Sequence, residues 1–266
     1  MNKEIPLIVP IAASYFKKAM TSQNETYYRS LDIRICLEKI ANLMIYEFVE
    51  SHIKEKWGRY DLHEKLLASK TFLNNKVVTD LIGAKKIGNK AVHEGLEANI
   101  TENNIEISLE AVSNFSIEMF VSFFKVNGFH NNGPSKWAPT ILSVLPPKYR
   151  IQILNKYLEY DKSYLVIRKL TMAYLKNGQD NECFQFIEKS YSDNLISREE
   201  AETLNYDMVS LKHSIKLLPI SGNLEKAKDN FQDLVKFIPV NDINKFALLV
   251  SMILGIDLVA STDSIS

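Results

Sequence analysis

The sequence has no excess of charge of either sign: 32 lysine and arginine residues balance 32 aspartate and glutamate residues. A neutral chain has no long-range positive field with which to attract nucleic acid, so any contact with nucleic acid has to be local. There are also only two cysteines, Cys36 and Cys183, and neither has a partner at metal-ligand spacing. This usage is typical of a reducing compartment, and we expect both to be small, buried apolar residues.

Long apolar runs are missing as well. The longest, 246–256, is shorter than the roughly 20 residues that span a bilayer, and a buried helix explains it more simply. The first residues include Glu4 and Pro6, where an export signal needs a basic head and an unbroken apolar stretch. We therefore expect a cytoplasmic protein with no membrane partner.

Several motifs of catalysis and cofactor binding are absent. The sequence contains no Gly-x-x-x-x-Gly-Lys-Ser/Thr loop, no Gly-x-Ser-x-Gly elbow and no His-Glu-x-x-His pair. These absences disfavour an ATPase, a hydrolase of the elbow type and a zinc protease. We accordingly predict no cofactor and no metal site.

What the chain does have is enough apolar material for a large core and room for two modest domains. It is 46% apolar over 266 residues, with 13 phenylalanines and 12 tyrosines. Apolar residues three or four positions apart predict a long helix over 25–53, with Ile33, Leu37, Ile40, Met44 and Phe48 on one face. Further N-terminal helices are predicted through 62–67, from 76 to a stop at Gly95, and over 108–126. Four helices in about 120 residues indicate an all-α bundle.

A segment dense in turn-forming residues, 127–134, follows this bundle. We therefore predict a first domain over 1–127, a linker over 128–136 and a second domain over 137–266. The second domain also has helical periodicity, and no strand pattern interrupts it. The helices expected there are 149–160, 163–177, 181–190, 198–218 and 224–238.

Two parts of the second domain are alike, because in each a glycine, Gly178 or Gly222, comes directly before a helix. The two glycines are 44 residues apart. A helix, a glycine turn and a second helix resemble tetratricopeptide-like units, although that repeat is shorter. Stacked helical hairpins of no named family explain the pattern equally well.

The segment 85–95, Lys-Lys-Ile-Gly-Asn-Lys-Ala-Val-His-Glu-Gly, resembles the Arg-x-x-Gly-Asn-x-Ala-x-His motif of a bacterial helical family of unassigned function. That family belongs to the HEPN superfamily. The segment 32–40, which contains Arg34 and Glu38, resembles the Arg-x-x-x-Glu segment that precedes this motif in the family. The resemblance covers about the first 125 residues and implies a HEPN-like N-terminal bundle.

Many HEPN proteins are metal-independent ribonucleases, whose site is an arginine, the polar residue after it and a histidine on one helix. By this resemblance Asn89 and His93 match the polar residue and the histidine, whereas the arginine position holds Gly88. A histidine can take a proton from a ribose 2′-hydroxyl while a cation stabilises the phosphate. Lys86, on the same helix stripe, and Arg34 are the candidates for that cation.

Structural roles explain the same residues. His93 can interact with the carbonyl end of its helix, and Asn89 can fix the register of the bundle by a hydrogen bond. Arg34 and Glu38, four residues apart, are expected to form an ordinary ion pair within one helix. The candidate nucleic-acid-binding lysines, Lys85, Lys86 and Lys90, are equally typical of a solvated helix face.

Three functions follow from these alternatives. The first is a helical adaptor or regulatory subunit, non-catalytic or weakly catalytic, in a bacterial anti-phage or restriction-type complex. Its partners by resemblance are a nuclease, a helicase or an SMC-like ATPase. The second is a HEPN-type endoribonuclease, which would need a homodimer through the N-terminal bundle. The third is a nucleic-acid-binding subunit, whose affinity would fall with salt and with loss of the three lysines.

Overall fold

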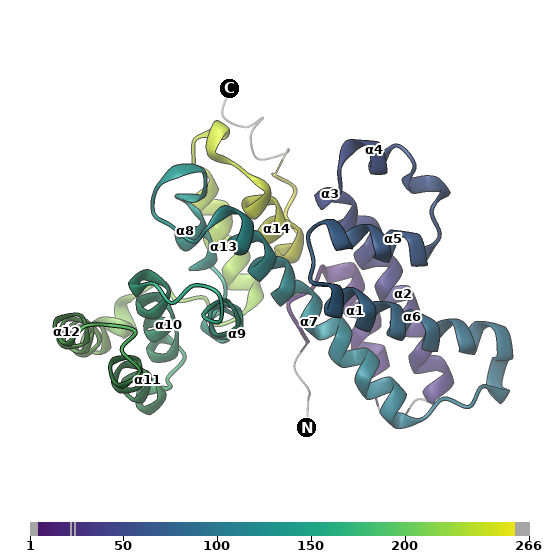
Figure 1. Ribbon diagram of the computed structural model, residues 1–266, viewed down its shortest axis with the longest axis horizontal. Coiled ribbons are helices and arrows are strands. Elements are labelled where there is room, and N and C mark those ends of the chain that lie inside the picture. Colours follow the sequence, from purple (N-terminus) through teal and green to yellow (C-terminus); the bar gives the residue numbers. More distant parts are fainter. Residues whose placement is uncertain (1–4, 22, 24, 259–266) are drawn as a thin grey trace. The chain divides into compact units, whose positions relative to one another are not determined.

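The computed structural model describes residues 5–258 except 22 and 24, and no strand occurs among these residues. The prediction of an all-α protein is therefore confirmed (Figure 1). The chain divides into two compact units, Met1–Ser122 and Phe123–Ser266. The boundary between the units lies within a helix rather than in the predicted linker.

The N-terminal unit is built around α2 (Thr26–Ile40), which packs against α1 (Pro10–Met20) and α6 (Asn75–Glu94) (Figure 1). The buried residues of α2 recur three or four positions apart, as the sequence predicts. Helix α1 is an addition to the predicted bundle. Cys36 lies in this core, and Cys183 lies in the core of the other unit; both thiols are free and buried, as predicted.

The helix predicted over 25–53 is not continuous. After α2 the chain forms a π-helical turn, η1 (Ala41–Ile45), and a short helix, α3 (Tyr46–Phe48). It becomes extended at Val49 (ψ 160°) before α4 (Ser51–Lys54). A π turn adds a residue to the helical ladder, and here Asn42 of that turn accepts hydrogen bonds from Trp57 Nε1 (3.1 Å) and Lys65 Nζ (3.0 Å).

Helix α5 (Leu62–Ala68) begins with a capping box, in which the Asp61 carboxylate accepts from the Glu64 N–H and the Glu64 carboxylate accepts from the Asp61 N–H. Helix α6 begins after Asn74, whose side chain accepts from the Lys76 N–H. It ends at Gly95, which has a φ of +64° that favours glycine, so the predicted stop is confirmed.

Helix α7 (Glu102–Asn127) is the longest helix of the described residues, and it runs through the boundary between the units. It is also the one helix among them that is long and apolar enough to cross a membrane, but 67% of its most apolar stretch is buried inside the protein. Its last turns belong to the second unit. There Phe123 and Phe124 pack against Phe246, with ring centroids 5.1 Å apart in both pairs.

The segment 128–136, predicted as a linker, packs onto the second unit instead. Phe129 is fully buried, and its ring lies 4.8 Å from that of Phe124. Ser135 is also buried, and its hydroxyl donates to the carbonyl of Asn127. The turn-forming residues are therefore a tight connection within one compact unit, because an apolar side chain in their midst reaches the core.

The second unit has seven helices in addition to the end of α7, among the residues described. Helices α9 to α12 pack on one another, and α14 packs on both α8 and α13 (Figure 1). The helices are α8 (Ala138–Leu142), α9 (Pro147–Tyr157), α10 (Tyr164–Lys176), α11 (Asp180–Ser192), α12 (Arg198–Ser214), α13 (Leu224–Val235) and α14 (Lys245–Leu254). The longest apolar run thus becomes the buried helix α14, as predicted.

The two glycine turns differ in what they join. Gly178, with a φ of +74°, connects α10 to α11, and these helices pack as a hairpin. Gly222 precedes α13, which packs on α14. The second glycine turn is followed by a different pairing of helices, so the resemblance between the two segments does not extend to a common hairpin.

Candidate functional site

Helices α2 and α6 pack closely against each other at Gly88. A Cβ atom at this position would lie 2.5 Å from the Arg34 Cβ and 3.0 Å from the Ser30 carbonyl oxygen. The nearest atom is at the base of a side chain, which cannot rotate away. Only glycine fits here, so Gly88 serves as a contact between α2 and α6.

The close approach brings Arg34 of α2 to Asn89 of α6. Arg34 Nε donates a hydrogen bond to Asn89 Oδ1 (3.0 Å), and Arg34 Nη1 pairs with Glu38 Oε1 (3.0 Å). The Arg34 side chain is 30% exposed. The predicted ion pair within α2 is confirmed, and the asparagine bonds across the bundle as its structural interpretation requires.

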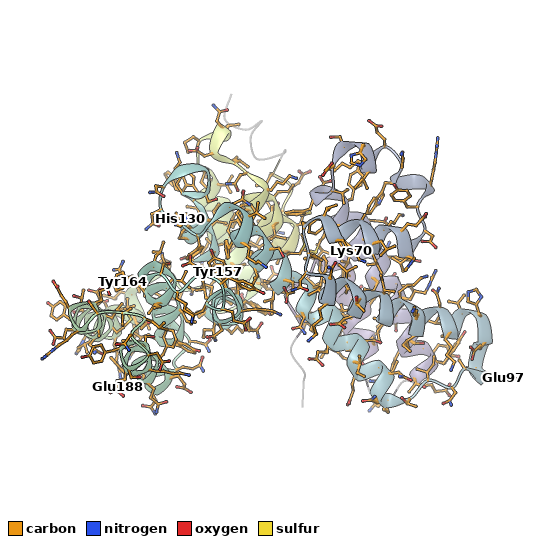
Figure 2. The ribbon with its side chains drawn as sticks, viewed as in Figure 1. Lys70, Glu97, His130, Tyr157, Tyr164 and Glu188 are labelled. Atoms are coloured by element: carbon orange, nitrogen blue, oxygen red, sulfur yellow. The ribbon has the colours of Figure 1, made fainter. Side chains whose placement is uncertain are left out.

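His93 lies one turn beyond Asn89, in the last turn of α6, and its side chain is exposed. Among the described residues, it takes part in no hydrogen bond or ion pair. Figure 2 labels Glu97, which ends the 3-10 turn Gly95–Glu97 directly after α6 and so marks this tip of the unit. The imidazole is thus accessible, but no cation or amide of the described chain is bonded to it.

The three candidate lysines of α6 have different surroundings. Lys90 Nζ donates to the Asn99 carbonyl (2.9 Å) and lies 3.9 Å from the Glu94 carboxylate. Lys85 is half-buried near Asp61: the hydrogen bond from the Glu64 N–H is the main cause of the lowered pKa of Asp61, and the charge of Lys85 lowers it further. Lys86 is exposed. Lys85 and Lys90 therefore already interact with acidic or carbonyl groups of their own unit.

The structure brings Arg34, Asn89 and Glu38 into one bonded group and leaves His93 and Lys86 as separate surface groups on α6. Cleavage at a ribose 2′-hydroxyl needs a proton acceptor and a cation around one phosphate. The guanidinium that could supply the cation is bonded on one side to an amide and on the other to a carboxylate. The bonded group is thus arranged to join two helices.

Arg29 makes polar contacts within this unit that no motif of the sequence indicates. Its side chain is almost fully buried; Nε donates to the Ala19 carbonyl (2.8 Å) and Nη1 pairs with Glu102 (2.6 Å). It therefore ties together α1, α2 and the first turn of α7. The signal was its position four residues before Ile33, on the buried stripe of the predicted helix.

Comparison of the chain with protein-family models, with curated proteins and with solved structures found no match. Within the described residues, no group of three or more histidine, cysteine, aspartate or glutamate side chains is placed to hold a metal ion.

Proposed function

We propose that this protein is a non-catalytic helical adaptor or regulatory subunit, with a HEPN-like bundle as its N-terminal unit. The observation that supports this proposal is the bonding of Arg34 to both Asn89 and Glu38. A catalytic cation has to approach the phosphate as negative charge develops there. A guanidinium that joins two helices would have to give up those bonds first.

The remaining motif residues fit the same role. Gly88 is needed for the helix contact, and Asn89 holds the partner helix in register. Lys86 and His93 stay at the surface of α6, where another protein can contact them. By resemblance, that protein is a nuclease, a helicase or an SMC-like ATPase of a bacterial anti-phage or restriction-type complex, in the cytoplasm.

One observation favours a second candidate, a metal-independent ribonuclease: the His93 imidazole is exposed and has no bonded partner in the described part of the chain. A second copy of the chain could then supply the missing cation, because a HEPN site forms where two bundles meet. The nucleic-acid-binding alternative has less support, since Lys85 and Lys90 interact with acidic or carbonyl groups of their own unit.

A cleavage assay separates the adaptor from the ribonuclease. Wild type, His93→Ala and His52→Ala are each incubated with total RNA and a chelator, and the products are examined for cyclic phosphate ends. His52 is an exposed histidine on α4 of the same unit and serves as the matched control. The adaptor proposal predicts no cleavage by any of the three. Cleavage that His93→Ala abolishes and His52→Ala retains would contradict it.

A further inference from the structure

Three basic side chains come together where α9 packs against α10 in the second unit. Arg150 lies on α9, and Lys169 and Lys176 lie on α10. The two lysines are seven residues apart, which is two turns, so they project from one face of α10. Figure 2 labels Tyr157 on α9 and Tyr164 on α10, the helices that carry this α9–α10 cation cluster.

Arg150 is buried without a partner. Its residue is 5% exposed, and its Nε is buried with no hydrogen-bond acceptor in reach. Within residues 5–258 that are described, no ion pair or hydrogen bond involves the side chain of Arg150, Lys169 or Lys176. A buried cation without a partner is costly, and native proteins keep such groups where something else compensates the charge.

Two acidic groups on the helices that pack against α10 pair with cations outside the cluster. Asp207 pairs with Arg168, the neighbour of Lys169 in sequence, at 3.1 Å. Asp180, at the start of α11, pairs with Lys212 of α12. The unit thus supplies counter-charges to the cations around the cluster but none to the three in it.

The cluster members act on one another electrostatically. Burial is the main cause of the lowered pKa of Lys176, about 8, and the charges of Arg150 and Lys169 lower it further. The pKa of Lys169 is lowered by burial, then by the charges of Arg168 and Arg150. Burial lowers the pKa of Arg150 to about 10, so it stays charged at neutral pH. Like charges that are close enough to lower one another's pKa also repel one another.

We propose that the α9–α10 cation cluster is a binding site for a phosphoryl group. Three cations with no acidic partner match a multiply charged anion better than the single charge of a carboxylate. A phosphate monoester carries a charge of about −1.5 to −2 at pH 7 and three strong acceptor oxygens. The Arg150 N–H groups would hydrogen-bond to these oxygens, and the two ammonium groups would balance the charge.

Two sources can supply the phosphoryl group: a free phosphate compound, such as a nucleotide or polyphosphate, and the backbone of a nucleic acid. Both present the same oxygens to the cluster. They differ in charge per phosphorus, because a backbone diester carries one negative charge. The probes of the experiment are chosen to separate them.

The test measures the thermal unfolding midpoint of the full chain with inorganic phosphate, pyrophosphate or an oligoribonucleotide that lacks a terminal phosphate. Chloride is the reference at matched ionic strength. The variants are Lys169→Met, Lys176→Met and the double variant, which keep the aliphatic stems and remove repelling charges, so they should fold at least as stably as wild type. Lys189→Met, at an exposed lysine of α11, is the control.

The proposal predicts that at least one probe raises the wild-type midpoint by several degrees, less in each single variant and not in the double variant, with Lys189→Met like wild type. A shift with phosphate or pyrophosphate identifies a free phosphate compound, and a shift with the oligoribonucleotide alone identifies a nucleic-acid backbone. The proposal is overturned if no probe shifts the midpoint, if the double variant responds like wild type, or if Lys189→Met loses the response as well.

Discussion

At Gly88 the central helices of the N-terminal unit lie so close that one added methyl group has no room. By its resemblance to the HEPN motif this glycine stands at an arginine position, and the structure shows that another helix crosses there. It is α2, through the Ser30 carbonyl and the base of Arg34. A residue that suggests catalysis by its place in a motif thus has a packing role.

We predict that Gly88→Ala destabilises the protein by about 1–3 kcal/mol, because the new Cβ would lie 2.5 Å from the Arg34 Cβ and the helices would have to separate. Gly83→Ala, on the same helix with nothing within 4 Å of its added Cβ, should instead stabilise by up to about 1 kcal/mol. Urea unfolding of both variants checks this. Equal effects of the two substitutions would mean that the contact at Gly88 does not constrain the helices.

Spacing along one helix made the Arg34–Glu38 pair predictable, because residues four apart in a helix are neighbours. The Arg34–Asn89 bond joins residues 55 apart in sequence, and helical spacing carries no information about which helix faces which. The structure, which packs α6 against α2, was needed to identify this bond. The same holds for Arg150 and the two lysines of α10, which no motif connects.

Among the elements, periodicity predicts best where one apolar face persists over several turns. Helices α6 and α7 were predicted in this way, although α7 begins at Glu102, before the predicted start at 108. The π turn at 41–45 was not predictable, because apolar residues continue at helical spacing through it. Helix α1 was missed as well. It starts at Pro10, at the first helical position, where proline is well accommodated.

The unbalanced positive charge of the α9–α10 cation cluster should make the stability of the protein depend on pH. The folded-state pKa of Lys176, about 8, lies below its ordinary value of 10.5. Below pH 8 both states hold the proton, and the folded state bears the full cost of the buried charge. As pH rises from about 8 to 10.5, the folded state loses this proton first, and the cost disappears.

Lys176→Met should therefore be more stable than wild type at pH 7, and its advantage should shrink as the pH approaches 10. The charges of Arg150 and Lys169 act on the Lys176 ammonium in wild type, and both residues are also present in the variant. Urea unfolding at pH 7, 8, 9 and 10 gives the difference in free energy of unfolding. A difference that does not change with pH would show that this ammonium is not perturbed.

In the molecule as a whole, length and composition predict two domains and periodicity predicts that both are helical, but the predicted boundary rests on turn-forming residues. Those residues mark the end of α7, whereas the units divide at Ser122–Phe123 within it. The end of one helix can belong to a second core when its aromatic side chains pack there. Periodicity continues across such a boundary and cannot reveal it.

The division into units predicts a local effect of Phe124→Ala. The Phe124 ring is fully buried against Phe129, Tyr157 and Phe246, all of the second unit. Its loss should cost about 3–5 kcal/mol. Hydrogen exchange should then show weaker protection in α9 and α14 and unchanged protection in α2 and α6. A uniform loss across both units would mean that they unfold as one.

Arg34 and Asn89 link the two helices at the centre of the N-terminal bundle, and a double-mutant cycle measures their coupling. The free energy of unfolding is determined for wild type, Arg34→Met, Asn89→Ala and the double variant. We predict a favourable coupling between the two side chains of about 0.5–3 kcal/mol, because each single variant removes the same 3.0 Å bond. Strictly additive effects would contradict the structural role and, with it, the adaptor proposal.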